Sequence, residues 1–166
     1  MTELQIRLLT ADDWDAVSLI YGDGIATGQA TFETEAPSWQ GWNGNHLAAP
    51  RLVATSGADV VGWAALGPSS ARAVYAGVAE TSVYVSSDWR GKGVGRALLE
   101  RLVVEAESNG IWTLQASIFP ENVASLELHR SCGFRVVGTR ERIGKMNGIW
   151  HDTLLLERRS NLVGSD

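Results

Sequence analysis

The sequence contains a single cysteine, Cys132, so no disulfide can form within the chain and a disulfide-stabilised secreted fold is excluded. The three histidines, His46, His129 and His151, lie far apart and lack the spacing of a zinc site, so no metal is expected. No apolar run approaches the ~18–20 residues that cross a membrane, and the first residues lack the basic start and apolar run of a signal peptide. These absences predict a cytoplasmic protein with no membrane partner.

Excess positive charge is also missing. The formal net charge is −5, so the chain lacks the electrostatic footprint of a nucleic-acid-binding protein. With 166 residues, of which 45% are apolar and 20% charged, it has the composition of an ordinary globular protein. We expect one domain over residues 1–160, with most of the seven tryptophans in its core, and a polar, frayed tail over residues 161–166.

Cap and turn residues divide the chain into alternating strands and helices. Thr10 with Asp13, Ser38 and Asn122 are typical helix starts, and the Gly-Asp-Gly run at 22–24 is expected to disturb the first helix. Strands are expected over residues 5–9, 51–56, 59–66, 80–85, 112–118, 134–139 and 150–157, and helices from residue 11 and over 39–46, 94–109 and 123–132. This order favours the α/β (α+β) class, a mixed sheet with helices on both faces.

The most informative stretch runs from residue 83 to residue 96. Val83-Tyr84-Val85 is typical of a strand, and the apolar spacing from Val94 onward predicts a helix. Between them three glycines alternate with basic residues in Arg90-Gly91-Lys92-Gly93-Val94-Gly95-Arg96. Glycine lets the backbone come close to a ligand, and the first N–H groups of a helix are free and lie at the positive end of its dipole. The stretch therefore predicts a site for a phosphate or diphosphate.

Two common phosphate loops do not fit this stretch. A Walker A loop needs its lysine after the second glycine, whereas Lys92 follows the first. The dinucleotide fingerprint needs Gly-x-Gly-x-x-Gly, and here the third glycine comes one residue early. On spacing alone, a glycine-rich turn with solvated basic residues stays open as the alternative.

A second motif lies downstream, in Asn122-Val-Ala-Ser125-Leu-Glu-Leu-His129 followed by Gly133-Phe134. Asn122 and His129 are seven residues apart, or two helical turns, so both can point along one ligand. Taken alone, the pattern favours a capping asparagine and a surface or satisfied histidine, because asparagine is a common cap.

Together the two motifs resemble the GNAT acyltransferases. Arg90, Gly93 and Gly95 occupy the positions of that family's Arg/Gln-x-x-Gly-x-Gly/Ala loop, which holds the pyrophosphate of acetyl-CoA. The resemblance implies a largely antiparallel central sheet of about seven strands and acetyl-CoA as cosubstrate. It also implies a set of cofactor-binding residues: Val83, Tyr84, Val85, Arg90, Gly91, Lys92, Gly93, Val94, Gly95, Arg96, Asn122 and Ser125.

Glu80 begins the strand that leads into the glycine loop. A carboxylate near an amine can act as general base, although a solvated carboxylate at a strand end is the alternative. Residues 79–85 resemble a segment of the phosphinothricin and methionine sulfoximine N-acetyltransferases, in which this glutamate is the proposed base. Residues 30–37, 72–75 and 148–152 also agree with that subgroup.

The resemblance implies an N-acetyltransferase in which the amine of a small amino acid or analogue attacks the thioester directly. It implies Glu80 and His129 as catalytic residues, a homodimer, and an acceptor site formed by Phe32, Glu33, Arg72 and Tyr75. Arg72 could pair with an acceptor carboxylate or phosphinate, or be a solvated loop cation. The alternatives are an acetyltransferase for a protein N-terminus or an aminoglycoside, and a non-catalytic acyl-CoA-binding sensor.

Overall fold

Seven strands and four α-helices make up residues 3–166, the part of the chain that the computed structural model describes. Residues 1–2 of the predicted domain lie outside this part. In chain order the elements are β1 (Leu4–Leu8), α1 (Trp14–Ala26), α2 (Trp39–Asn45), β2 (Arg51–Ser56), β3 (Asp59–Pro68), β4 (Val78–Val85), α3 (Val94–Ser108), β5 (Thr113–Ile118), α4 (Val123–Ser131), β6 (Arg135–Met146) and β7 (Ile149–Arg159). Each strand and helix expected from the sequence has a counterpart among them.

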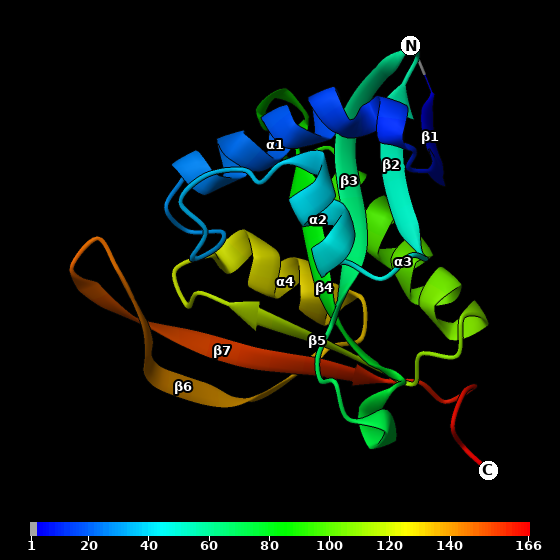
Figure 1. Cartoon of the computed structure of the whole chain (residues 1–166), viewed down its shortest axis with the longest axis vertical. Helices are drawn as coiled ribbons and strands as arrows, with labels where there is room; N and C mark the ends of the chain where they lie inside the picture. Colours follow the sequence, from blue (N-terminus) through cyan, green and yellow to red (C-terminus); the bar gives the residue numbers. More distant parts are fainter. Residues whose placement is uncertain (1–2) are drawn as a thin grey trace.

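The strands form one sheet in the order β1-β2-β3-β4-β5-β7-β6. Within the described residues, neighbouring strands pair antiparallel except β4 and β5, which pair parallel. This parallel pairing covers only Val78–Glu80 against Thr113–Gln115. Beyond it the two halves of the sheet diverge: β4 runs upright in Figure 1, while β5 and β7 run across the view. The predicted mixed, largely antiparallel sheet is confirmed, and it opens in the middle.

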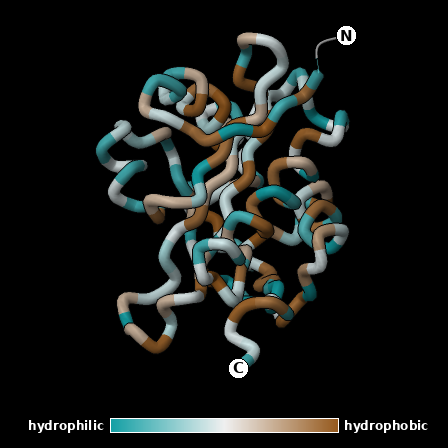
Figure 2. Tube along the Cα trace, turned by 90° about the vertical axis from the view of Figure 1, so that its right-hand side faces the viewer, coloured by the Kyte–Doolittle hydropathy of each residue, from teal (hydrophilic) through white to brown (hydrophobic). Residues whose placement is uncertain are grey.

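Alternate residues of the inner strands feed two hydrophobic cores, one on each face of the sheet. On β2, Leu52 and Ala54 join the core under α3 and α4, whereas Val53 joins the core under α1 and α2. The predicted apolar stripe of α3 is buried in the first core, and Leu98 and Leu102 are fully inaccessible there. Figure 2 shows hydrophobic and hydrophilic residues alternating along the coils of the helices, as expected for elements with one buried side.

The second core is largely aromatic. Trp42 and Trp63 are fully buried, and their rings meet edge-on with centroids 5.6 Å apart. Trp14 and Trp39 pack against Trp42 from α1 and from the start of α2. Trp150, by contrast, is 55% exposed near the β6–β7 turn. The expectation that most tryptophans serve the core holds for this cluster but not for Trp150.

The start of the first helix follows the prediction, but its end does not. Asp13 accepts a hydrogen bond from the backbone N–H of Thr10 at 2.8 Å, which confirms the capping box. The Gly-Asp-Gly run at 22–24 was expected to disturb the helix, yet α1 continues through it to Ala26. A Cβ at Gly24 would lie 2.6 Å from the ring of Tyr84, so this glycine lets α1 approach the sheet closely.

β6 also differs from its prediction, since it continues to Met146 rather than ending at Thr139. Most of its side chains are exposed, so the polar run Arg140-Glu141-Arg142 can occupy the strand without burying charge. Its pairing with β7 is irregular between Arg140 and Gly144. An exposed edge strand has little alternation of apolar and polar residues. The hydrophobic pattern therefore predicts only its first half.

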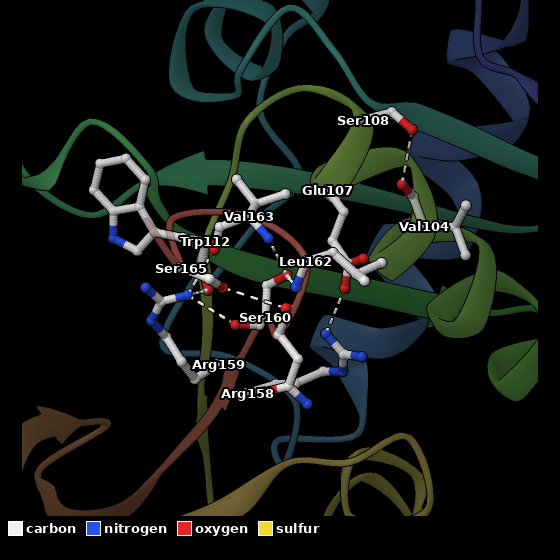
Figure 3. A network of polar contacts seen from close by, with 11 residues as sticks. Val104, Glu107, Ser108, Trp112, Arg158, Arg159, Ser160, Leu162, Val163 and Ser165 are labelled. Atoms are coloured by element: carbon white, nitrogen blue, oxygen red, sulfur yellow. Dashed lines mark hydrogen bonds and ion pairs between the residues drawn. The ribbon is translucent and has the colours of Figure 1, made fainter.

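The polar tail over residues 161–166 is tied to the end of β7 rather than frayed. The guanidinium of Arg159 donates hydrogen bonds to the carbonyls of Ser160 and Val163, both at 2.8 Å, and to that of Gly164. The Ser160 hydroxyl accepts from the backbone N–H of Val163 at 3.1 Å. Figure 3 shows this network beside the end of α3. Within residues 3–166, no helix is both long and apolar enough to cross a membrane.

Two glycines of α1 provide a matched test of the close contact with Tyr84. Gly24→Ala should lower the free energy of unfolding by about 1–3 kcal/mol, because overpacking outweighs the better helix propensity of alanine. Gly22→Ala, whose Cβ would meet no described atom within 4 Å, should raise it by about 0.5–1 kcal/mol. Urea unfolding of both variants measures the difference, and an equal gain in both would show that α1 does not need this glycine.

Candidate active site

A cleft of about 840 Å³ occupies the opening between β4 and β5. Its wall includes residues from β4, the glycine loop, the start of α3, the end of β5 and α4. Among the residues predicted for the site, those in the wall are Phe32, Glu80, Val83, Tyr84, Val85, Arg90, Gly91, Gly93, Val94, Gly95, Arg96, Asn122, Ser125 and His129. The divergence of two strands thus brings together motifs that are about 40 residues apart in the sequence.

The glycine loop has the conformation that its sequence suggests. Gly91 and Gly93 have φ of 74° and 82°, in the left-handed region that favours glycine, and Gly93 is the N-cap of α3. A Cβ at either position would meet nothing within 4 Å among residues 3–166, so the space beside the loop is open. At Gly95 a Cβ would lie 3.3 Å from Leu128, so this glycine serves the approach of α3 to α4 instead. The loop and the free N–H groups of α3 can therefore receive an anionic group.

The basic residues of the loop differ in their surroundings. Arg90 lines the cleft. Arg96 also lines it, but its Nε donates to Glu100 at 2.8 Å in an exposed ion pair, which contributes little to stability. Lys92 lies outside the cleft wall, with its ammonium 5.1 Å from the centre of the Trp89 ring. Arg90 is thus the cation best placed for a bound anion.

The backbone of β4 presents hydrogen-bonding groups to the cleft. The carbonyl of Gly77 accepts from β5, and the N–H of Ser86 donates to β3, so odd-numbered residues of β4 face β5 and even-numbered ones face β3. Pairing with β5 stops at Glu80. The backbone N–H and C=O groups of Val83 and Val85 therefore face the cleft instead of a neighbouring strand, and they can pair with an extended ligand that carries amide groups.

Asn122 has a structural role, as its sequence position predicts. Its side-chain oxygen accepts from the backbone N–H of Ser125 at 3.2 Å and so caps α4. Its amide nitrogen donates to the carbonyl of Gln29 at 3.2 Å and so ties α4 to the loop after α1. The cap and the loop contact both hold this part of the cleft wall in place.

His129 is 4% exposed and sits between two oxygens. Its Nδ1 lies 2.8 Å from the backbone carbonyl of Ser125, and its Nε2 lies 3.1 Å from the hydroxyl of Thr81. Burial lowers the pKa of His129, and the bond to Ser125 opposes only part of this effect. The ring is therefore held neutral at the back of the cleft.

Glu80 and His129 approach the cleft from opposite faces of the sheet, because neighbouring side chains of a strand alternate. Thr81 points toward α4 and His129, whereas Tyr84 stacks on Trp63 under α1, with ring centroids 4.9 Å apart. Glu80 shares the face of Tyr84. It also borders a smaller hollow of about 300 Å³, beside the end of α2 and the end of β3.

The carboxyl group of Glu80 has a raised pKa. Burial is the main cause, and the positive charge of Arg140 partly offsets it. Arg140 stands opposite Thr153 of β7, a buried residue of the cleft wall, so both side chains lie on one face of the sheet. A half-buried carboxylate whose pKa burial raises is a candidate for proton transfer.

The four residues predicted for an acceptor site are not all brought together. Phe32 lines the cleft and packs edge-on against Phe119, with ring centroids 4.8 Å apart. Glu33, Arg72 and Tyr75 lie outside the cleft wall. The Arg72 guanidinium lies over the exposed Tyr75 ring, 5.6 Å from its centre. The acceptor role of these three residues stays a prediction.

The sequence analysis missed two residues, Thr81, which lines the cleft, and Arg140, which lies outside the cleft wall but whose charge acts on Glu80. Thr81 is adjacent to Glu80, and the alternation of a strand could have placed it on the opposite face. Arg140 depends on the register between β6 and β7, for which the sequence carries no local signal. Among the described residues, no group of three histidine, cysteine or acidic side chains could hold a metal ion.

The sequence and the fold are both similar to those of known proteins. Residues 15–134 match the model of the acetyltransferase (GNAT) family. Phosphinothricin N-acetyltransferase of Alcaligenes faecalis is 33% identical over 94% of this chain and 82% of its own length. L-methionine sulfoximine/L-methionine sulfone acetyltransferase of Pseudomonas aeruginosa is 37% identical over 80% of this chain and 73% of its own. The fold is similar to the crystal structure of a GNAT phosphinothricin acetyltransferase from Sinorhizobium meliloti in complex with acetyl-CoA, with a TM-score of 0.88 and 30% identity over 100% of this chain and 92% of that one.

Proposed function

The chain belongs to the GNAT family of acetyl-CoA-dependent N-acetyltransferases, and from this premise we propose that it acetylates the amine of a small amino acid or amino-acid analogue. The observation that carries the proposal is the single cleft that contains the glycine loop, the free edge of β4 and Glu80. The phosphinothricin and methionine sulfoximine acetyltransferases among its relatives support this acceptor class. An L-amino acid N-acyltransferase of Escherichia coli, 33% identical over 93% of this chain and 92% of its own length, supports it further.

The residues present suit acetyl-CoA. The open space at Gly91 and Gly93 and the N-terminus of α3 form a cradle for its diphosphate, with Arg90 as the cation. The free C=O group of Val83 and both backbone groups of Val85 match the amides of its pantetheine arm. When bound, acetyl-CoA supplies the thioester whose acetyl group is transferred.

Glu80 begins the reaction by taking a proton from the acceptor ammonium through a water molecule, since only the neutral amine is a nucleophile. The N–H group of Val83, the nearer of the two to Glu80, stabilises the negative charge on the carbonyl oxygen as the amine attacks. A C–N bond forms and a C–S bond breaks, with the electron pair left on sulfur. His129 supports protonation of this thiolate. The acetyl group passes directly to the amine, so no covalent enzyme intermediate is expected.

The acid group of the acceptor would be held on the Glu80 face of the sheet. Arg140 supplies a guanidinium there, and guanidinium groups bind carboxylates and phosphinates in a bidentate manner. Phe32, packed against Phe119 and His151, forms an apolar wall of the cleft near this face. Such a site selects a compact molecule with an amine beside an acid group.

One second candidate has support from a solved structure. A ribosomal-protein-alanine N-acetyltransferase from Brucella melitensis has a TM-score of 0.85 and 34% identity over 94% of this chain and 99% of that one. In this alternative the acceptor is a protein N-terminus.

The expected homodimer stays a prediction. Three apolar side chains that are exposed near the β6–β7 turn could form its contact: Ile143, Ile149 and Trp150.

A thiol-release screen with acetyl-CoA tests the acceptor class. Free amino acids, methionine sulfone, methionine sulfoximine and phosphinothricin should release coenzyme A, whereas aminoglycosides and peptides should not. Methyl esters, which lack the acid charge, should react at least about tenfold less efficiently, the loss expected when a charge-assisted hydrogen-bonded pair is removed. Release of coenzyme A with peptides alone would support a protein N-terminus as the acceptor. If none of the amines led to release, an acyl-CoA sensor would be favoured.

A pair of left-handed glycines tests the diphosphate cradle. Gly93→Ala and Gly110→Ala both force alanine into a positive φ with open space around it, at a cost of about 1–2 kcal/mol in stability. Only Gly93→Ala should weaken acetyl-CoA binding, by about tenfold, as for one lost charge-assisted hydrogen bond. Calorimetric titration with acetyl-CoA measures the affinity of each variant. Equal affinity in the two variants would contradict the placement of the diphosphate.

The role of Glu80 is tested by the pH profile of kcat/KM. The carboxyl must be ionised to act as base and burial raises its pKa, so activity should fall with decreasing pH from a higher pH than for an exposed carboxyl. Glu80→Gln should lower kcat/KM by about 10²–10⁴-fold and remove the part of the acid limb that belongs to this carboxyl, so that only the titration of the acceptor ammonium remains. Asp59→Asn, at an exposed position in the β2–β3 hairpin, is the control. An acid limb in Glu80→Gln that is identical to that of the wild type would exclude Glu80 as the base.

A further inference from the structure

Thr81 places a hydroxyl group in the cleft on the side opposite Glu80. Its Oγ1 lies 3.1 Å from Nε2 of His129 and 3.5 Å from the backbone carbonyl of Gln115. Thr81 and His129 both line the cleft, although His129 is almost completely buried. The hydroxyl therefore contacts the Nε2 side of the imidazole and is itself part of the cleft wall.

The direction of the hydrogen bond between Thr81 and His129 follows from the other side of the ring. A carbonyl oxygen can only accept, so the 2.8 Å contact between Nδ1 and the Ser125 carbonyl requires a proton on Nδ1. In a neutral imidazole the other nitrogen, Nε2, is then an acceptor. Burial favours the neutral ring. The hydroxyl has a single proton, and its contact with Nε2 at 3.1 Å is shorter than its contact with the Gln115 carbonyl at 3.5 Å. Thr81 thus donates to Nε2, and its oxygen lone pairs are left to accept from the cleft.

This arrangement also limits what His129 can do alone. Both ring nitrogens are engaged, one by the Ser125 carbonyl and one by the Thr81 hydroxyl. A proton that leaves the amine can reach Nε2 only by way of the hydroxyl. The same order of groups, a hydroxyl, a histidine and an acceptor that orients the histidine, transfers protons in many active sites.

From this geometry we infer that Thr81 is a further catalytic residue, which relays a proton between the reacting amine and His129; the inference rests on the proposed acetyl transfer. After the amine has attacked, Oγ1 of Thr81 accepts a proton from the amine nitrogen while its own proton passes to Nε2 of His129. The C–S bond then breaks and the electron pair stays on sulfur. His129 returns the proton through Thr81 to the thiolate, so the products are the amide and the free thiol, and both side chains regain their starting state.

Hydroxyl deletion and restoration test the relay with the best acceptor found in the screen. Thr81→Val, which keeps the shape of the side chain, should lower kcat by about tenfold to a hundredfold, the lower part of the range for general acid–base catalysis. The Kd of acetyl-CoA and the KM of the acceptor should change by less than about threefold, because the change acts on the transition state. Thr81→Ser should restore most of kcat. Thr55→Val, the same change at another buried strand residue outside the cleft, should leave kcat unchanged.

A double-mutant cycle with His129→Ala separates a relay from two independent effects. If His129 acts through Thr81, the double variant should be no slower than the slower single variant, whereas independent roles would multiply the two losses. Multiplied losses, an unchanged kcat in Thr81→Val, or an acetylated Thr81 in the intact protein would each overturn the relay.

Nitrogen-15 NMR of histidine decides the same point without any acceptor. The relay predicts that His129 has a proton on Nδ1 and a bare Nε2, and that Thr81→Val shifts the Nε2 resonance. A proton on Nε2 would overturn it. If the wild-type protein acetylates no amine, the proposed function fails, while this measurement still shows whether Thr81 donates to His129.

Discussion

The early end of the pairing between β4 and β5 is the constraint on which the site depends. Three residues of β4 are paired in parallel with β5, and after Glu80 the strands separate. Backbone groups that would normally pair with a neighbouring strand then face the cleft. Because an unpaired backbone group costs free energy when it is buried, these groups need solvent or a ligand as hydrogen-bond partner. The glycine loop and α3 follow directly at the end of the same strand. The polar edge and the anion cradle are therefore parts of one continuous segment.

The alternation of side chains along β4 places the two proposed proton-transfer groups on opposite faces of the sheet. Glu80 lies on the face of Tyr84 and of the aromatic core, near the guanidinium of Arg140. Thr81 lies on the face of α4 and contacts His129. In the proposed mechanism, proton uptake from the ammonium and proton return to the thiolate take place on opposite sides of one strand. Because Glu80 and Thr81 are adjacent residues of one strand, the two groups are kept on opposite faces without any conformational change.

Local features of the chain could be predicted from the sequence, and long-range ones could not. The glycine loop, the Asn122 cap and the apolar stripe of α3 depend on residues close together in the sequence, and each has the expected form. Gly24 allows α1 to lie close to the ring of Tyr84, 60 residues away in the sequence, and the Gly-Asp-Gly run by itself predicts a break instead. The position of Arg140 depends on the register of β6 against β7 across two irregularities, which no local pattern encodes.

Residue-resolved amide exchange tests the exposed edge of β4 most directly. In the free protein the N–H groups of Val83 and Val85 should exchange faster than those of Ser82 and Tyr84, which face β3. Acetyl-CoA should slow exchange at Val83 and Val85 by at least about tenfold, the equivalent of ~1.4 kcal/mol of local protection. Uniform protection of all four residues without ligand, or no change on adding acetyl-CoA, would contradict the account.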